Sequence, residues 1–102
     1  MRFGLKENTI KQINRVFSKY PQVDKVILYG SRAKGNYKTG SDIDITLKGE
    51  GLNLSSVHKI ELEIDDLFLP YTFDISIFNQ ISNPDLLEHI NRVGKVFYEK
   101  EV

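Results

Sequence analysis

The sequence predicts an α/β (α+β) fold in which a small mixed β-sheet of about four strands is flanked by helices. Segments with apolar residues at helical spacing alternate along the chain with short runs of β-branched and aromatic residues. The chain has 102 residues and a 40% hydrophobic content, enough for one modest core. No internal repeat or linker divides it, so we expect a single domain over residues 1–102.

The first predicted element is an amphipathic helix over residues 8–20. Its apolar residues recur every three or four positions, Asn8 or Thr9 can cap its start, and Pro21 ends it. A β-branched and aromatic run over residues 25–29 then predicts a buried strand.

The middle of the chain predicts a loop, a second strand and a second long helix. Residues 31–41 are rich in glycine and basic residues and show no apolar periodicity, so we expect a loop with one helical turn at its start. The strict alternation of polar and apolar residues over 42–47 predicts a strand. A helix capped by Ser55 or Ser56 follows and ends before Pro70.

The last third predicts a strand, a helix and a short final strand. Alternation over residues 71–78 indicates the strand. Asn83 and Pro84 provide an N-cap and a first helical residue, and Gly94 ends that helix. A short apolar run over 96–98 closes the chain. The expected order is therefore helix, strand, strand, helix, strand, helix, strand.

Composition narrows the class of protein. No apolar run approaches the ~18 residues of a membrane span, and the amino terminus lacks a signal-peptide core. The absence of cysteine excludes disulfide frameworks and thiolate metal sites. We therefore expect a soluble cytoplasmic protein with no membrane partner. Its formal charge is zero, but residues 1–41 carry a net charge of +7 and residues 42–102 a net charge of −7.

Three aspartates occupy segments that otherwise predict strands, where aspartate is depleted. Asp42 and Asp44 share one face of their strand, and Asp74 points away from its apolar neighbours. If the two strands are adjacent, three carboxylates converge, and such a cluster normally holds a cation. Oxygen ligands without cysteine or histidine favour Mg²⁺, with Mn²⁺ as the alternative. Two such ions would leave the site with a net positive charge suited to phosphate chemistry.

A phosphate-binding turn is predicted directly after the first strand. Gly30 and Ser31 stand where backbone N–H groups and a hydroxyl can receive a phosphate, and the guanidinium of Arg32 can hold phosphate oxygens. His58 and His89 lie on predicted helices beside charged residues, so we expect both at the surface.

These residues resemble the signature of a known family. Gly30-Ser31, ten further residues and then Asp42-Ile43-Asp44 resemble the GSx10DxD motif of the DNA polymerase β-like nucleotidyltransferase superfamily. The segment 28–35 is similar to that of its minimal branch, the minimal nucleotidyltransferase (MNT) domains, and Asp74 is similar to their third metal ligand. The resemblance implies two Mg²⁺ ions bound by the three aspartates, which act as the catalytic residues, and ATP phosphates held by Gly30, Ser31 and Arg32.

The resemblance also implies an activity and a partner. MNT proteins of the MntA type pair with a HEPN-domain ribonuclease toxin and act as its antitoxin, and some transfer AMP from ATP to a tyrosine of that toxin. We therefore expect a nucleotidyltransferase with a HEPN protein as partner and no direct binding of nucleic acid. The alternative is a catalytically weak or inactive module that neutralises a HEPN partner by complex formation. Transfer to a small molecule or RNA is a weaker alternative, because the chain has no room for a further acceptor-binding domain.

A site on so small a domain must be shallow. We therefore expect a partner or a second copy of the chain to cover it.

Overall fold

The computed structural model describes residues 1–101 and confirms the predicted α/β class. The elements in chain order are α1 (Glu7–Ser18), β1 (Lys25–Tyr29), α2 (Gly30–Lys34), β2 (Ile43–Lys48), α3 (Leu54–Asp65), β3 (Phe73–Ile77), the 3₁₀ turn η1 (Phe78–Gln80), α4 (Pro84–Val93) and β4 (Lys95–Glu99). In the described residues no helix combines the length and the hydropathy that crossing a lipid bilayer requires.

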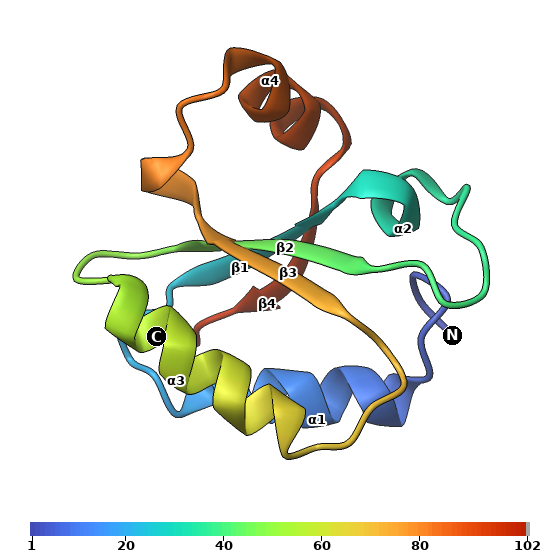
Figure 1. Cartoon of the computed structure of the whole chain (residues 1–102), viewed down its shortest axis with the longest axis horizontal. Coiled ribbons are helices and arrows are strands. Elements are labelled where there is room, and N and C mark those ends of the chain that lie inside the picture. The colour runs from blue at the N-terminus through green and yellow to red at the C-terminus, as the bar shows by residue number, and fades with distance from the viewer. Residues whose placement is uncertain (102) are drawn as a thin grey trace.

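The four strands form one mixed sheet in the order β3-β2-β1-β4. β1 runs antiparallel to β2 and β4, whereas β2 and β3 are parallel. Helices α1 and α3 cover one face of this sheet, and α4 lies over the other (Figure 1). The central strand β1 is consequently buried on both sides.

Alternation along the strands separates the two faces. Ile43, Ile45 and Leu47 of β2 are fully buried in the main core beneath α1 and α3. Ile27 and Tyr29 of β1 point the other way and pack with α4 in a smaller apolar cluster. The second face is therefore only partly covered by apolar side chains, and this leaves room there for polar groups.

The starts of two helices differ from the prediction. α1 begins at Glu7, before the caps predicted at Asn8 and Thr9, and Lys6 in the N-cap position makes no side-chain capping bond. An ion pair of 3.0 Å between Arg2 and Glu7 instead joins the first turn to the preceding segment. The cap prediction was wrong because the helix starts earlier, with acidic Glu7 in its first turn, where a negative charge suits the positive end of a helix.

α3 is capped by Asn53 and not by the predicted Ser55 or Ser56. The Asn53 side-chain oxygen accepts hydrogen bonds from the Ser56 N–H at 2.9 Å and the Ser56 hydroxyl at 3.1 Å. Placing the cap two or three residues earlier satisfies the backbone donor and the buried hydroxyl together. α4 begins as predicted, with the Asn83 side chain accepting from two backbone N–H groups.

Gly94 ends α4 as predicted, but for a different reason from the usual left-handed cap. Its φ of −59° is open to any residue. A Cβ at this position would overlap the Ile90 carbonyl oxygen and lie 2.7 Å from Cγ2 of Ile27 in β1. The glycine is thus required by the close approach of the chain to the sheet.

Strand boundaries follow the pairing in the sheet. β2 begins at Ile43 and not at Asp42, β3 is shorter than the predicted segment 71–78, and β4 is longer than 96–98. An unpredicted feature is the turn at the amino terminus, where Arg2 and Leu5 form an isolated antiparallel bridge. This amino-terminal turn, residues 2–5, lies close to the candidate site.

Candidate active site

The turn after β1 brings glycine and carboxylate together. Gly30 opens α2 with a φ of +74°, in the left-handed region that favours glycine. A Cβ added at Gly30 would overlap the Asp44 carboxylate oxygen Oδ2. The predicted phosphate turn and the predicted metal ligand are therefore in direct contact.

The predicted adjacency of the two aspartate-bearing strands is confirmed. Asp44 of β2 lies opposite Tyr29 of β1 on one side and opposite Asp74 of β3 on the other. Asp44 is half-buried, while Asp74 and Asp42, two residues before Asp44, are exposed. An acidic row therefore crosses the sheet on the face opposite to the main core, and the site is open at the surface.

The electrostatics of this row match its geometry. Burial raises the pKa of Asp44 above its ordinary value of 3.8, and the charges of Asp74 and Asp42 raise it further, whereas His89 acts in the opposite direction. Burial also raises the pKa of Tyr29, Ser76 acts in the opposite direction, and the charges of Asp74 and Asp44 raise it further. The charges of Asp42, Asp44 and Asp74 are therefore close enough to influence one another.

Whether these residues fit a divalent cation depends on donors and their arrangement. The three carboxylates supply hard oxygen donors of the type that Mg²⁺ and Mn²⁺ prefer. In residues 1–101, no three acidic, histidine or cysteine side chains form a preassembled metal cluster. The chemistry of Asp42, Asp44 and Asp74 thus fits the ion.

His89 was predicted at the surface, and that prediction was wrong. Its ring is partly buried, and its Nε2 accepts a hydrogen bond of 3.1 Å from the Gly30 N–H. The ring also packs edge-on against Tyr29, with centroids 6.2 Å apart. The signal that could have found it is helical spacing, since His89 shares the sheet-facing stripe of α4 with Leu86 and Ile90. His58 is exposed as predicted.

Arg32 is placed differently from the other predicted phosphate-binding residues. Its side chain is buried, with 3% exposed, and its guanidinium donates hydrogen bonds to the backbone carbonyls of Phe3 and Ser41. Gly30 and Ser31 remain in the turn beside Asp44. The contact between Arg32 and a phosphate stays a prediction.

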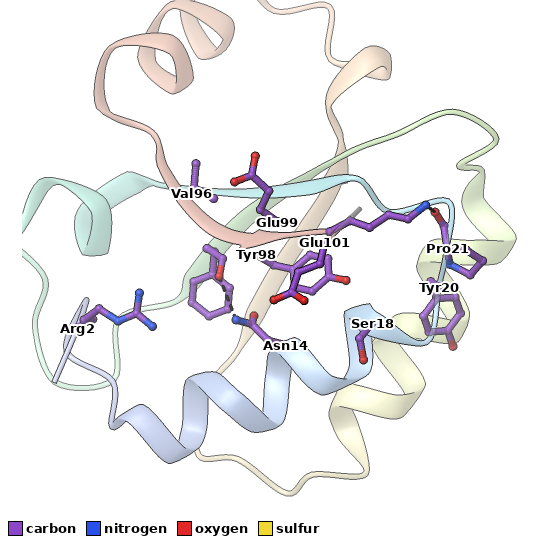
Figure 2. Close-up of a pocket in the computed structure, with 11 residues that line it drawn as sticks. Arg2, Asn14, Ser18, Tyr20, Pro21, Val96, Tyr98, Glu99 and Glu101 are labelled. Atoms are coloured by element: carbon purple, nitrogen blue, oxygen red, sulfur yellow. Dashed lines mark hydrogen bonds between the residues drawn. The ribbon is translucent and has the colours of Figure 1, made fainter.

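A separate cavity of about 640 Å³ lies between α1 and β4 (Figure 2). Asn14 and Ser18 of α1 line one side, and residues 96–101 line the other. The Asn14 side chain donates to the Phe97 carbonyl oxygen at 3.1 Å across this gap. None of the six predicted site residues lines the cavity, so we assign it no part in the chemistry of the acidic row.

An acidic row beside a glycine turn is an arrangement suited to phosphate chemistry, and comparison with known proteins defines the family. The family model described as polymerase beta, nucleotidyltransferase, matches residues 11–102. The chain therefore belongs to the polymerase beta nucleotidyltransferase family, and the superfamily inferred from its sequence signature is confirmed.

One curated relative is "Putative protein adenylyltransferase MJ0604" of Methanocaldococcus jannaschii. It is 46% identical over 46 residues, which make up 43% of this chain and 46% of that protein. The chain thus spans about half the length of the curated relative it matches.

Solved structures with the same fold include toxin–antitoxin complexes. One is a toxin–antitoxin crystal structure with AMP-PNP, with a TM-score of 0.70, 20% identity, and coverage of 95% of this chain and 76% of the other. Another is a tri-AMPylated Shewanella oneidensis HEPN toxin in complex with its MNT antitoxin, with a TM-score of 0.68, 14% identity, and coverage of 94% and 74%. At these identities the likeness establishes the fold.

Proposed function

We propose that this protein is a Mg²⁺-dependent nucleotidyltransferase that moves AMP from ATP to a tyrosine hydroxyl of a HEPN-domain partner and thereby acts as an antitoxin. The observation that carries the proposal is the contact between Gly30 and Asp44, with Asp74 in register beside Asp44. This contact sets the glycine turn at residue 30 directly against the acidic row. The name of the curated relative and the AMPylated toxin in one structural neighbour support AMP as the transferred group.

In this proposal the chain's residues hold the nucleotide and move one proton. Asp42 and Asp44 would hold both Mg²⁺ ions, and Asp74 would hold one of them. When bound, these ions supply charge neutralisation and polarise the α-phosphate. The backbone N–H and hydroxyl of Ser31, together with the Gly30 turn, hold the departing phosphates. His89 already accepts from the Gly30 N–H, so Ser31 carries most of this contact.

The proposed transfer is an in-line displacement. The acceptor oxygen forms a bond to the α-phosphorus, the bond from that phosphorus to the bridging oxygen breaks, and pyrophosphate leaves. Asp74 accepts the hydroxyl proton, which an exposed carboxylate at the edge of the row can pass to water. The product is a tyrosyl-AMP ester and pyrophosphate.

Labelled ATP tests the proposal. The protein is incubated with α-labelled ATP, Mg²⁺ and a HEPN protein encoded beside it, and label on the HEPN protein is measured. The double variant Asp42→Asn/Asp44→Asn should abolish labelling. The control Asp65→Asn/Asp66→Asn removes two exposed carboxylates from the end of α3 and should label normally. Equal labelling by both double variants would overturn the proposal.

A second candidate is a module that neutralises its partner by binding alone. The structural neighbours solved as toxin–antitoxin complexes favour it. Growth rescue in cells expressing the toxin separates the two. Rescue by Asp42→Asn/Asp44→Asn equal to that of the wild type would assign neutralisation to contact.

A further inference from the structure

The side chain of Arg32 is a buried cation whose hydrogen bonds go to the backbone. Nε and Nη2 donate to the carbonyl oxygen of Ser41 at 3.1 and 2.9 Å, and Nη1 donates to that of Phe3 at 2.8 Å. Three of the five N–H bonds of the guanidinium are thus used within the chain. Burying a charged group is costly unless its donors are satisfied, so these bonds fix the carbonyls as well as the arginine.

Two aromatic rings complete the surroundings of Arg32. Its guanidinium carbon lies 5.3 Å from the ring centroid of Tyr37 and 5.0 Å from that of Tyr71. Both rings therefore lie within cation–π distance of the guanidinium. Tyr37 belongs to the loop between α2 and β2, and Tyr71 lies shortly before β3, which carries Asp74.

The amino-terminal turn is packed closely onto the same guanidinium. Gly4 has a φ of +74°, and a Cβ there would overlap the Tyr37 ring and lie 2.9 Å from Nη1 of Arg32. Ser41 is also fixed from its other side, because its hydroxyl accepts from the Lys38 N–H at 2.8 Å. The residue that directly precedes Asp42 is therefore held by both its backbone carbonyl and its side chain.

We propose that Arg32 is a positioning residue, which fixes Asp42 relative to the Gly30-Ser31 turn by joining α2, residues 2–5 and the Ser41 carbonyl. The expected effect of Arg32 on AMP transfer rests on the proposed function. Arg32 acts through Asp42 and makes no contact with the nucleotide. Loss of this link leaves the start of β2 free to shift relative to α2, which weakens metal binding by Asp42 and Asp44.

Two variants test this role by different routes. Arg32→Lys keeps the charge, but one ammonium cannot reach both carbonyls in the way that the planar fork does. Gly4→Ala leaves every charge in place and displaces the Tyr37 ring and the guanidinium. Lys34→Ala, which removes an exposed basic side chain from the same short helix, is the control.

The first readout needs neither nucleotide nor acceptor. Hydrogen exchange of the backbone amides of residues 41–43 should be faster in Arg32→Lys and Gly4→Ala than in the wild type and Lys34→Ala. Mn²⁺ affinity, measured by electron paramagnetic resonance, should fall about tenfold in the same two variants, the lower end of the effect of losing a partner that orients a metal ligand. Both measurements remain decisive if the wild type proves to transfer no AMP.

The second readout separates positioning from phosphate contact. In an active wild type, both variants should lower kcat about tenfold and leave the KM for ATP within about twofold. If the KM for ATP rises in Arg32→Lys but stays at the wild-type value in Gly4→Ala, then Arg32 contacts a phosphate of ATP, and the positioning role is overturned. Unchanged exchange and unchanged Mn²⁺ affinity in both variants would equally overturn the proposal.

Discussion

The two faces of the sheet are built from the same strands and differ in almost every other respect. On the face under α1 and α3, Ile43, Ile45 and Leu47 of β2 are fully buried among apolar side chains. On the opposite face, the intervening Asp44 lies beside Gly30 and opposite Asp74. Because successive side chains of a strand point to opposite faces, neighbouring residues of β2 belong to the core and to the candidate site. Stability and chemistry should therefore respond separately to substitutions one residue apart.

The largest effect on stability is expected on the face of the sheet that α1 and α3 cover. Ile45→Ala removes a side chain with 0% exposed, and such truncations lower the free energy of unfolding by about 2 to 5 kcal/mol. Urea denaturation measures the loss. Val96→Ala, a truncation of a side chain that is 48% exposed, is the control and should change stability by under about 1 kcal/mol. If Ile45→Ala loses AMP transfer under conditions where it is fully folded, then stability and activity do not respond separately to substitutions on the two faces.

On the opposite face, which carries Asp44 and Asp74, we expect a smaller change in the free energy of unfolding but a large change in activity. Asp74→Asn should reduce AMP transfer at least about a hundredfold, because a direct ligand should matter at least as much as the groups that orient ligands. Its stability should stay within about 0.5 kcal/mol of the wild type, since Asp74 is exposed. Asp66→Asn provides the matched exposed control. Retention of most activity by Asp74→Asn would remove β3 from the proposed mechanism.

The third expectation concerns pH and the acidic row. Burial and the charges of Asp74 and Asp42 raise the pKa of Asp44 in the folded chain, so ionisation of Asp44 opposes folding. This unfavourable contribution is fully present above the raised pKa and disappears as the pH falls below 3.8. Asp44→Asn should therefore be more stable than the metal-free wild type at pH 7, with the difference shrinking on acidification.

Urea denaturation of both proteins between about pH 3 and pH 7 measures this difference. Saturating Mg²⁺ should stabilise the wild type more than Asp44→Asn, because a ligand that binds the folded state raises its stability. A difference that does not change with pH would indicate that the carboxylate is not strained by its neighbours.

The smallest effects on activity are expected at the two asparagine caps, one for each face. Asn53→Ala and Asn83→Ala should each lower the free energy of unfolding by about 1 kcal/mol, since each side chain accepts from backbone N–H groups at a helix start. The first variant should leave transfer unchanged. The second loosens α4, which carries His89, so a modest loss of activity is expected only there. Equal activity in both variants would show that the position of α4 does not influence the candidate site.

Much of the fold followed from local patterns in the sequence. Apolar spacing located the long helices, and alternation located the strands and the face of each aspartate. The pairing order β3-β2-β1-β4 and the parallel pairing of β2 with β3 depend on contacts between distant segments, which periodicity does not encode. The turn over residues 2–5 was missed because Gly4 was its one turn signal and Phe3 adopts a φ of 58°, which is uncommon for a non-glycine residue.

In the candidate site, too, the sequence predicted some residues and left out contacts between distant segments. The positions of Asp42, Asp44 and Asp74 followed from spacing and strand alternation, and their neighbour Gly30 from its place after a strand. The sequence could not reveal that His89 accepts from Gly30, because that contact depends on how α4 lies on the sheet. It also gave no sign that the donors of Arg32 turn inward, since the carbonyl of Phe3 comes from a remote segment.

The pairing of Asp44 with Asp74 also bears on folding fidelity. In this sheet a slip of one residue between β2 and its neighbours would turn Asp44 toward the apolar layer and bring Ile43 and Ile45 out to solvent. An ionised carboxylate without a partner is strongly unfavourable in such a layer. Mispaired chains would thus be penalised twice, by the exposed isoleucines and by the buried charge. The register that keeps Ile43 and Ile45 in the core is thus the same register that keeps Asp44 on the polar face.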